Sequence, residues 1–244
     1  MTANLEGLAH ASTEVPEDSR PRRALVVAAH PDDAEFGAAG TAYLWSKQGW
    51  QFFYLVCTNG AKGSDNESIT RSQLIEMRRE EQRAAARLLG VEEVFFLDNE
   101  DGELTPHRAF LGDVVRYIRR LRPDAVFTHD PETVIVRDSF VNHSDHRATG
   151  LTAIDAVYPA ARDRLNFPEQ VAAGLAPHKV SEIYIWGSEH ANFEVDISEA
   201  IDVKLEALKA HTSQFAGDFL DRARERWSRP DGRYVESFRR VQLS

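Results

Sequence analysis

Short, mainly apolar runs alternate with segments of helical periodicity along this 244-residue chain, and this alternation limits the folds open to it. The apolar runs, which are typical of strands covered on both faces, lie at 24–29, 51–57, 93–97 and 124–128. The helical segments that follow the first three runs lie at about 34–48, 70–89 and 108–121. Strands that alternate with helices of this length form βαβ crossovers, so the sequence predicts an α/β fold with a parallel sheet.

The second half of the chain continues the alternation less regularly. A further helix is expected from about 144 to 158, then strands at 182–187 and 193–197 and a last clear helix at 199–211. The tail at 215–244 is charged and aromatic, and it either packs on a neighbouring chain or closes its own domain. Because no internal repeat or linker is evident, we expect one domain.

The composition of the first residues indicates where that domain begins. Residues 1–22 are polar, rich in Glu, Ser and Pro, and without periodicity, so we expect a mobile N-terminal arm followed by a single domain at 23–244. The glycines at 37 and 40 do not form a G-x-G-x-x-G loop and are expected to let the first helix pack closely on the sheet.

Composition narrows the functional classes. A formal net charge of −10 argues against a general nucleic-acid or anionic-membrane surface, since both require a positive footprint. The single cysteine, Cys57, excludes an intrachain disulfide. No apolar run approaches the ~20 residues of a membrane span, and the first 23 residues lack the apolar core of a secretory signal. We therefore expect a cytoplasmic enzyme.

Polar residues stand where the first strand ends and where a later helix begins. His30, Asp32 and Asp33 follow the run at 24–29, and His143 and His146 are three residues apart at a predicted helix start. In a doubly wound sheet such positions converge at one edge, where ligands bind. Two histidines and a carboxylate are a common ligand set for a catalytic zinc, and a second carboxylate beside it suits a general base.

Simpler explanations compete with the metal site. Asp32 or Asp33 is also a good helix N-cap, because a carboxylate accepts hydrogen bonds from the first backbone N–H groups and interacts favourably with the helix dipole. The pairing with a second cluster at 143–146 favours a metal site instead. A set of two histidines and one carboxylate also suits iron, so zinc and iron both remain open.

Two separated motifs resemble the PIG-L/LmbE family. They are residues 29–37, Ala-His-Pro-Asp-Asp-Ala-Glu-Phe-Gly, and residues 143–146, His-Ser-Asp-His. Supporting pieces at 78–81, 101–104 and 204–214 extend the resemblance over nearly the whole chain. Members of this family are zinc-dependent N-deacetylases of N-acetylglucosaminyl compounds. The resemblance also implies a Rossmann-like, three-layer α/β/α fold of the LmbE type with a mostly parallel sheet.

Carried over residue by residue, the resemblance implies roles for the polar cluster. It makes His30, Asp33 and His146 the zinc ligands. It makes Asp32 the general base that takes a proton from the attacking water. It makes His143 the group that stabilises the oxyanion or protonates the leaving amine, with Asp145 orienting that imidazole.

The substrate side is less sharply defined. The resemblance places Arg78 near the aglycone or phosphate side of the substrate and Asp101 near the sugar hydroxyls, although Arg78 alone would be interpreted as part of a solvated helix face. His129, at the end of a predicted strand, is expected either to line the pocket or to make a structural hydrogen bond. Some relatives place a tyrosine just before the second motif; residues 139–142 contain no phenol, so Asn142 is a candidate to assist His143 at the oxyanion.

The expected function is hydrolysis of a linear, non-peptide amide. The enzyme would remove the N-acetyl group from an N-acetylglucosamine-type sugar or conjugate and release acetate and a free amine. One alternative is an amidase of the same family acting on a thiol conjugate; another is a non-catalytic nucleotide- or sugar-binding module on the same fold. Inositol, malate, lipid and antibiotic aglycones are all compatible with the sequence, as is a homo-oligomer.

Overall fold

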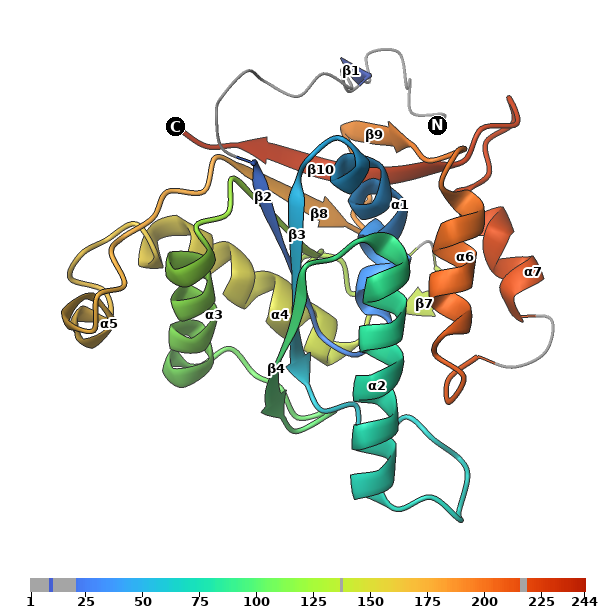
Figure 1. Cartoon of the computed structure of the whole chain (residues 1–244), viewed down its shortest axis with the longest axis horizontal. Helices are drawn as coiled ribbons and strands as arrows, with labels where there is room; N and C mark the ends of the chain where they lie inside the picture. The colour runs from blue at the N-terminus through green and yellow to red at the C-terminus, as the bar shows by residue number, and fades with distance from the viewer. Residues whose placement is uncertain (1–8, 11–20, 137, 216–218) are drawn as a thin grey trace.

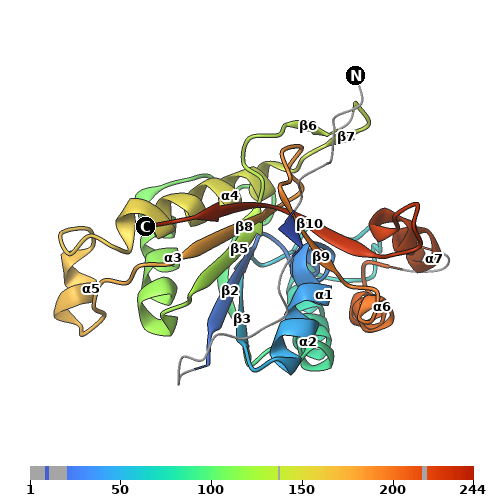
Figure 2. The same ribbon diagram turned by 90° about the horizontal axis from the view of Figure 1, so that it is seen from above.

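The computed structural model describes residues 9–10, 21–136, 138–215 and 219–244, which form one mixed sheet with helices on both faces (Figure 1, Figure 2). Within these residues the spatial order of the eight-stranded sheet is β1-β9-β10-β8-β5-β2-β3-β4. Five neighbouring strands are parallel and extend to the edge formed by β4: β2 (Arg23–Ala28), β3 (Gln51–Thr58), β4 (Glu93–Asn99), β5 (Ala125–His129) and β8 (Glu182–Trp186). The expected α/β fold with a mostly parallel sheet is confirmed.

The helices divide between the two faces of the sheet. One face carries α1 (Asp33–Lys47), α2 (Arg71–Leu89), α6 (Ile201–Lys209) and α7 (Phe219–Arg224). The other carries α3 (Arg108–Leu121), α4 (Ser144–Asp155) and the short α5 (Pro168–Ala172) (Figure 2). The helix after the second polar motif is shorter than expected, because α4 ends at Asp155 and a π-helical turn, Ala156–Ala160, follows it.

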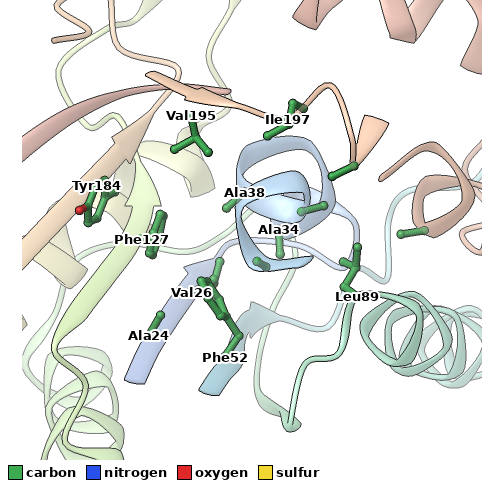
Figure 3. Close-up of a cluster of buried hydrophobic side chains, with 14 of the residues drawn as sticks. Ala24, Val26, Ala34, Ala38, Phe52, Leu89, Phe127, Tyr184, Val195 and Ile197 are labelled. Atoms are coloured by element: carbon green, nitrogen blue, oxygen red, sulfur yellow. The ribbon is translucent and has the colours of Figure 1, made fainter. Parts of the chain in front are cut away.

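The strand β2 is buried from both sides, which explains its unbroken apolar sequence. Val26 faces α1, α2 and α6 within one core cluster, whereas Val27 faces α3 and α4 within the other. Figure 3 shows the first cluster, in which the alanines of α1, including Ala34 and Ala38, lie above Val26 and Phe52. Small side chains on α1 therefore bring the helix, and the turn that precedes it, close to the sheet.

The two glycines of α1 serve this close approach, as expected. A Cβ atom at Gly37 would lie 2.4 Å from the ring of Trp186, and one at Gly40 would lie 2.6 Å from Ile197. Both distances are too short for a real contact, so any larger residue would push α1 away from β8 and from the segment after β9 (Phe193–Asp196).

The charged tail contains a strand that the sequence did not indicate. β10 (Val235–Gln242) runs antiparallel between β8 and β9, so the tail closes its own domain. Its charged side chains are paired within the protein: Glu236 with Lys204, and Arg240 with Glu182. The short strand β1 (Ala9–His10) pairs with β9, while the rest of the predicted N-terminal arm up to residue 20 lies outside the described residues.

A small hairpin separates the main sheet from the second polar motif. β6 (Ile135–Val136) and β7 (Phe140–Val141) pair with each other outside the main sheet, between β5 and α4. These strands are too short to give a periodic signal in the sequence. In the described part of the chain, no helix combines the length and apolar character that crossing a bilayer would require.

Candidate active site and metal centre

A cavity of about 870 Å³ opens at the carboxyl ends of β2, β5 and β8. The parallel arrangement brings residues that are far apart in sequence to this edge of the sheet. The sequence-predicted residues that line the cavity are His30, Asp32, Asp33, Arg78, Asp101, His129, Asn142, His143 and His146. Asp145 is the one predicted site residue that lies behind the cavity wall, completely buried.

The three predicted ligands converge on one point. In the turn after β2, the His30 N–H donates to Asp33 Oδ2 at 2.7 Å, which folds the aspartate back toward the imidazole. His30 Nδ1 then lies 3.3 Å from Asp33 Oδ2, and His146 Nε2 lies 3.2 Å from Asp33 Oδ1. One ligand atom from each residue falls within 4.8 Å of the other two, which is close enough to share a metal ion.

The far nitrogens of both histidines contact acceptors that orient the rings. His30 Nε2 lies 3.1 Å from Asp145 Oδ2 and 3.2 Å from Asp101 Oδ1. His146 Nδ1 lies 3.3 Å from the amide oxygen of Asn142. Because carboxylate and amide oxygens only accept, they keep a proton on each of these outer nitrogens, so a metal ion that displaces the remaining proton would meet the nitrogens that face Asp33. This tautomer pattern is the one that metal ligation needs.

Negative charge is concentrated around His30. Burial favours the neutral imidazole, but hydrogen bonds to Asp101, Asp145 and Asp33 outweigh it and raise the pKa of His30 to about 12. Burial likewise opposes ionisation of Asp33, yet the neighbouring His146 and His129 hold its pKa well below the usual range. Several buried carboxylates around one imidazole form an environment that a bound cation would neutralise, so the residues fit a metal ion.

Asp32 does not cap α1 with its side chain, although it occupies the N-cap position. Its backbone has φ 102° and ψ −27°, in the left-handed region that non-glycine residues seldom adopt. Its N–H donates to Gln82 Oε1 at 2.9 Å, and its carboxylate accepts from Arg78 Nη2 at 3.1 Å. Burial and the charge of Asp33 raise the pKa of Asp32 to about 7. The helix-cap explanation is therefore wrong for Asp32.

His143 lies beside the ligand cluster and is open to the cavity. Its ring packs edge-on against that of His30, with 4.8 Å between the centroids. Its Nδ1 accepts from the Asp145 N–H at 3.1 Å, so a neutral ring carries its proton on Nε2. Burial and the charge of His30 lower the pKa of His143, which favours that neutral form.

Asp145 contacts His143 and His30 through different groups. Its carboxylate contacts His30 and accepts from the N–H groups of Gly102, at 2.7 Å, and Leu104, at 3.2 Å. Only its backbone N–H contacts His143. Asp145 therefore contacts His143 through its backbone and directs its carboxylate to His30, and the orienting role that the resemblance implies for it stays a prediction.

Arg78 is buried, with 3% of its surface exposed, so its interpretation as part of a solvated helix face is wrong. Its guanidinium donates to Gly60 O at 3.0 Å, to Pro31 O at 2.7 Å and to Asp32. A Cβ atom at Gly60 would lie 2.8 Å from Arg78 Nη1, and the φ of +63° at Gly60 also favours glycine. Arg78 thus ties α2 to the turn that carries the aspartate pair.

The other predicted substrate contacts also have partners within the protein. Asp101 accepts from the Lys62 N–H at 2.9 Å as well as approaching His30. The Asn142 amide donates to Asp130 O at 3.1 Å and to Thr133 O at 2.9 Å.

His129 lines the cavity and supports the ligand cluster at the same time. Its Nε2 accepts from the Ala29 N–H at 3.1 Å, and its ring stacks on His146 with 4.3 Å between centroids. Burial and the charge of His146 lower its pKa to about 4.

Some cavity residues had no signal in the sequence analysis. Gln82, which is fully buried behind Asp32, also had no signal, although it lies four positions after Arg78 on the same helix and therefore on the same face. The aromatic wall was missed as well, because its members come from four separate elements or segments: Phe36, Phe140, Trp186 and Phe215.

Comparison of the sequence with known proteins identifies a family. The PIG-L family model, described as GlcNAc-PI de-N-acetylase, matches residues 25–157. Diacetylchitobiose deacetylase of Thermococcus kodakarensis is 33% identical over 197 residues, covering 81% of this chain and 72% of that protein. A probable N-acetyl-alpha-D-glucosaminyl L-malate deacetylase 2 of Bacillus anthracis is 29% identical, covering 84% of this chain and 86% of that protein.

A solved structure agrees over most of the chain. N,N'-diacetylchitobiose deacetylase from Pyrococcus horikoshii, complexed with its inhibitor, superposes with a TM-score of 0.83 at 31% identity, covering 91% of this chain and 84% of that one. The family match spans more than half of the chain and includes both halves of the ligand cluster. The chain therefore belongs to the PIG-L family.

Proposed function

We propose that this protein is a zinc-dependent hydrolase that removes the N-acetyl group from an N-acetylglucosamine-type sugar or conjugate. The observation that carries the proposal is the convergence of His30, Asp33 and His146 within 4.8 Å in a cavity that also contains Asp32 and His143. The similarity to proteins named as deacetylases of such sugars supports the same reaction.

Hydrolysis of an acetamide needs a nucleophilic water, relief of charge on the carbonyl oxygen and a proton for the leaving nitrogen. A zinc ion bound by the three ligands would supply Lewis acidity that polarises the carbonyl and acidifies the attacking water. Asp32 takes the proton from that water, with its carboxylate held by Arg78. His143, with its proton on Nε2, donates a hydrogen bond to the developing oxyanion. The proton that Asp32 takes from the water is the one delivered to the leaving nitrogen, directly or through a protonated His143.

Residues around the ligands hold them in place in this proposal. Asp145 and Asp101 orient His30, and Asn142 orients His146, as carboxylates and amides do around metal-bound imidazoles. Arg78 and Asn142 are thereby assigned to positioning rather than to the substrate contacts that the sequence suggested. Imidazole and carboxylate ligands suit zinc and also iron, so the test compares the activity of the zinc-loaded protein with that of the iron-loaded protein.

The test measures acetate release and metal content together. Purified protein, freed of metal and reloaded with zinc or with iron, is assayed on N,N'-diacetylchitobiose and on malate and inositol conjugates of N-acetylglucosamine. We expect about one zinc per chain and acetate release from at least one substrate. The Asp32→Ala variant should keep its metal and lose acetate release, because the base is gone while the ligands remain.

Each alternative gives a different result in the same assay. An amidase specific for a thiol conjugate would cleave the amide of that conjugate and leave the acetylated sugars intact. A non-catalytic sugar-binding module would bind a sugar without releasing acetate under any metal. The proposal fails if the protein binds no divalent metal and the His30→Ala variant behaves like the wild type.

A further inference from the structure

Two buried polar networks connect α2 to the segment that follows α6, and one of them reaches the turn with Asp32. The first, which we call the Glu35 network, begins at His211, whose Nε2 lies 3.2 Å from Glu35 Oε2. Gln82 Nε2 donates to Glu35 Oε1 at 2.8 Å, and Gln82 Oε1 accepts from the Asp32 N–H at 2.9 Å. The network therefore ends on the backbone of the proposed base.

The second, which we call the Glu81 network, joins the same two parts of the molecule without touching Asp32. Glu81 accepts from Thr212 Oγ1 at 2.8 Å, from the Ser213 N–H at 2.8 Å and from Ser213 Oγ at 2.7 Å. Glu81 and Gln82 are neighbours on α2, and both are buried. The molecule thus offers two similar linkages that differ in whether they reach the cavity.

The Glu35 network fixes the direction of the Gln82 amide. Glu35, Gln82 and His211 are fully buried, at 0% exposure. A carboxylate only accepts hydrogen bonds, so the amide nitrogen of Gln82 turns toward Glu35 and the amide oxygen turns toward Asp32. A buried pair such as Glu35 and His211 is costly to desolvate, so its net contribution to stability is small, whereas it fixes the direction of the Gln82 amide.

Asp32 needs this acceptor because its backbone is strained. Its φ of 102° places it in a region that costs a non-glycine residue on the order of 1–3 kcal/mol and persists only when neighbouring contacts hold it. Gln82 holds the N–H, and Arg78 holds the carboxylate and the preceding carbonyl of Pro31. Gln82 and Arg78 are one turn apart on α2, so a single helix binds both the backbone N–H and the carboxylate of Asp32.

We propose that Gln82, kept in one orientation by Glu35 and His211, is a positioning residue that sets the direction of the Asp32 carboxylate. The catalytic consequence rests on the proposed function, whereas the effect on the Asp32 backbone does not. The Glu81 network is a matched control, since it links the same elements and leaves Asp32 untouched.

The kinetic test uses Gln82→Met, which keeps side-chain length and removes the acceptor. A displacement of about 1 Å at a reacting group costs on the order of 10²-fold in rate, so we expect kcat to fall by roughly 10- to 100-fold. The KM and the zinc content should stay near the wild-type values, because neither the ligands nor the cavity wall is altered. The Glu81→Gln variant should lower Tm and leave kcat within about twofold of the wild type.

A polarity swap provides the rescue. Gln82→Glu alone places two carboxylates against each other and should lose kcat at least as strongly as Gln82→Met. Combined with Glu35→Gln, it restores the sequence of donors and acceptors: the new amide donates to residue 82 and accepts from His211. The double variant should recover most of the lost kcat, a result that a general loss of packing would not produce.

A measurement that needs no activity separates this inference from the proposed function. Hydrogen exchange of the Asp32 amide should be slow in the wild type, faster in Gln82→Met and unchanged in Glu81→Gln. If the wild type releases no acetate from any substrate, the proposed function fails while the exchange data still decide the positioning role. The inference is overturned if Gln82→Met exchanges and reacts like the wild type, or if Glu81→Gln loses as much kcat.

Discussion

Two of the buried ionic clusters that contact helix α1 differ in how their polar atoms are used. In the middle of the helix is the Lys204 cluster, formed by Lys204, Glu236 and Thr41. Lys204 Nζ donates to Glu236 Oε1 at 2.6 Å and to Phe36 O at 2.8 Å, and it lies 4.1 Å from the centre of the Trp227 ring. Glu236 also accepts from Thr41 N–H and Oγ1, at 2.8 and 2.6 Å.

At the amino-terminal end of α1 the arrangement is the opposite. Once the ring nitrogens that face Asp33 give up their protons, the ligand atoms of His30, Asp33 and His146 face one another as acceptors, and the His30 N–H is the donor that holds Asp33 beside them. Charge and burial are therefore common to a structural cluster and to a candidate site. What separates them is whether acceptors converge on each other or on donors of the same protein.

The largest expected effect is on the ligand cluster. Replacing His146 with alanine removes one of the three proposed ligands and leaves the Lys204 cluster intact. We expect the variant to bind zinc too weakly to retain it through dialysis and to release acetate no faster than a protein-free control, while circular dichroism stays unchanged. Retention of a full equivalent of zinc would remove His146 from the ligand set.

Substitutions in the Lys204 cluster should lower the free energy of unfolding and leave zinc binding and acetate release unchanged. The Glu236→Ala variant leaves a buried ammonium unpaired, which costs about 3–5 kcal/mol of unfolding free energy, measured by urea titration. The double variant Lys204→Met/Glu236→Leu should recover most of this loss, because it removes both charges. The comparison would break if Glu236→Ala kept its stability and lost zinc instead.

A substitution of a residue that lies behind the proposed metal ligands should have an intermediate effect on zinc affinity. Asp145→Asn weakens the acceptor that holds His30 and should lower zinc affinity by about 10- to 100-fold, as removal of such outer partners does. Competition with a chelator of known affinity measures this change. A variant that binds zinc as the wild type does would show that Asp101 alone orients the ring.

The smallest effect is a dependence of stability on pH. Burial opposes protonation of His211, but the hydrogen bond and charge of Glu35 outweigh it and raise the pKa of His211 above 6.5. A raised folded-state pKa means that the protonated histidine stabilises the fold fully below pH 6.5 and that this contribution disappears as the pH rises through the folded-state value.

Urea titrations of the wild type and of His211→Gln between pH 6 and 9 measure this contribution. The advantage of the wild type should shrink as the pH rises, and an advantage that grew with pH would reverse the assignment. Because the two proteins are compared at each pH, the titration of groups that His211 does not influence cancels; Asp32, whose pKa the charge of His211 lowers, contributes to the difference in the same direction as the loss of the histidine, because that effect also requires the protonated imidazole.

The sequence was most informative where local patterns coincide with tertiary position. The apolar run before His30 predicted a strand buried on both faces, and the end of that strand predicted the edge on which the ligands lie. The pairing of 30–33 with 143–146 was predictable because parallel strands end at the same edge of the sheet.

The partners of the site residues were not predictable in the same way. Which imidazole Asp145 contacts depends on how α4 meets the turn at 101–104, and this is a tertiary relation without a sequence period. Arg78 lies on a helix rich in exposed charges, so its burial against Asp32 had no local signal. β10 was missed because its charged residues, which form ion pairs with α6 and with β8, interrupt the apolar pattern expected of a strand.

The position of β10 also bears on the order of folding. Among the described strands, β9 pairs only with β10 and with the short β1, so it has no firm place in the sheet until β10 is present. Glu236 on β10 also accepts from the Gly40 N–H at 2.8 Å, a contact between residues 196 positions apart. Contacts of such long range form slowly. During synthesis, the turn with His30 and Asp33 therefore leaves the ribosome early, but the hydrogen bonds that Glu236 makes to its helix form only after nearly two hundred further residues have followed.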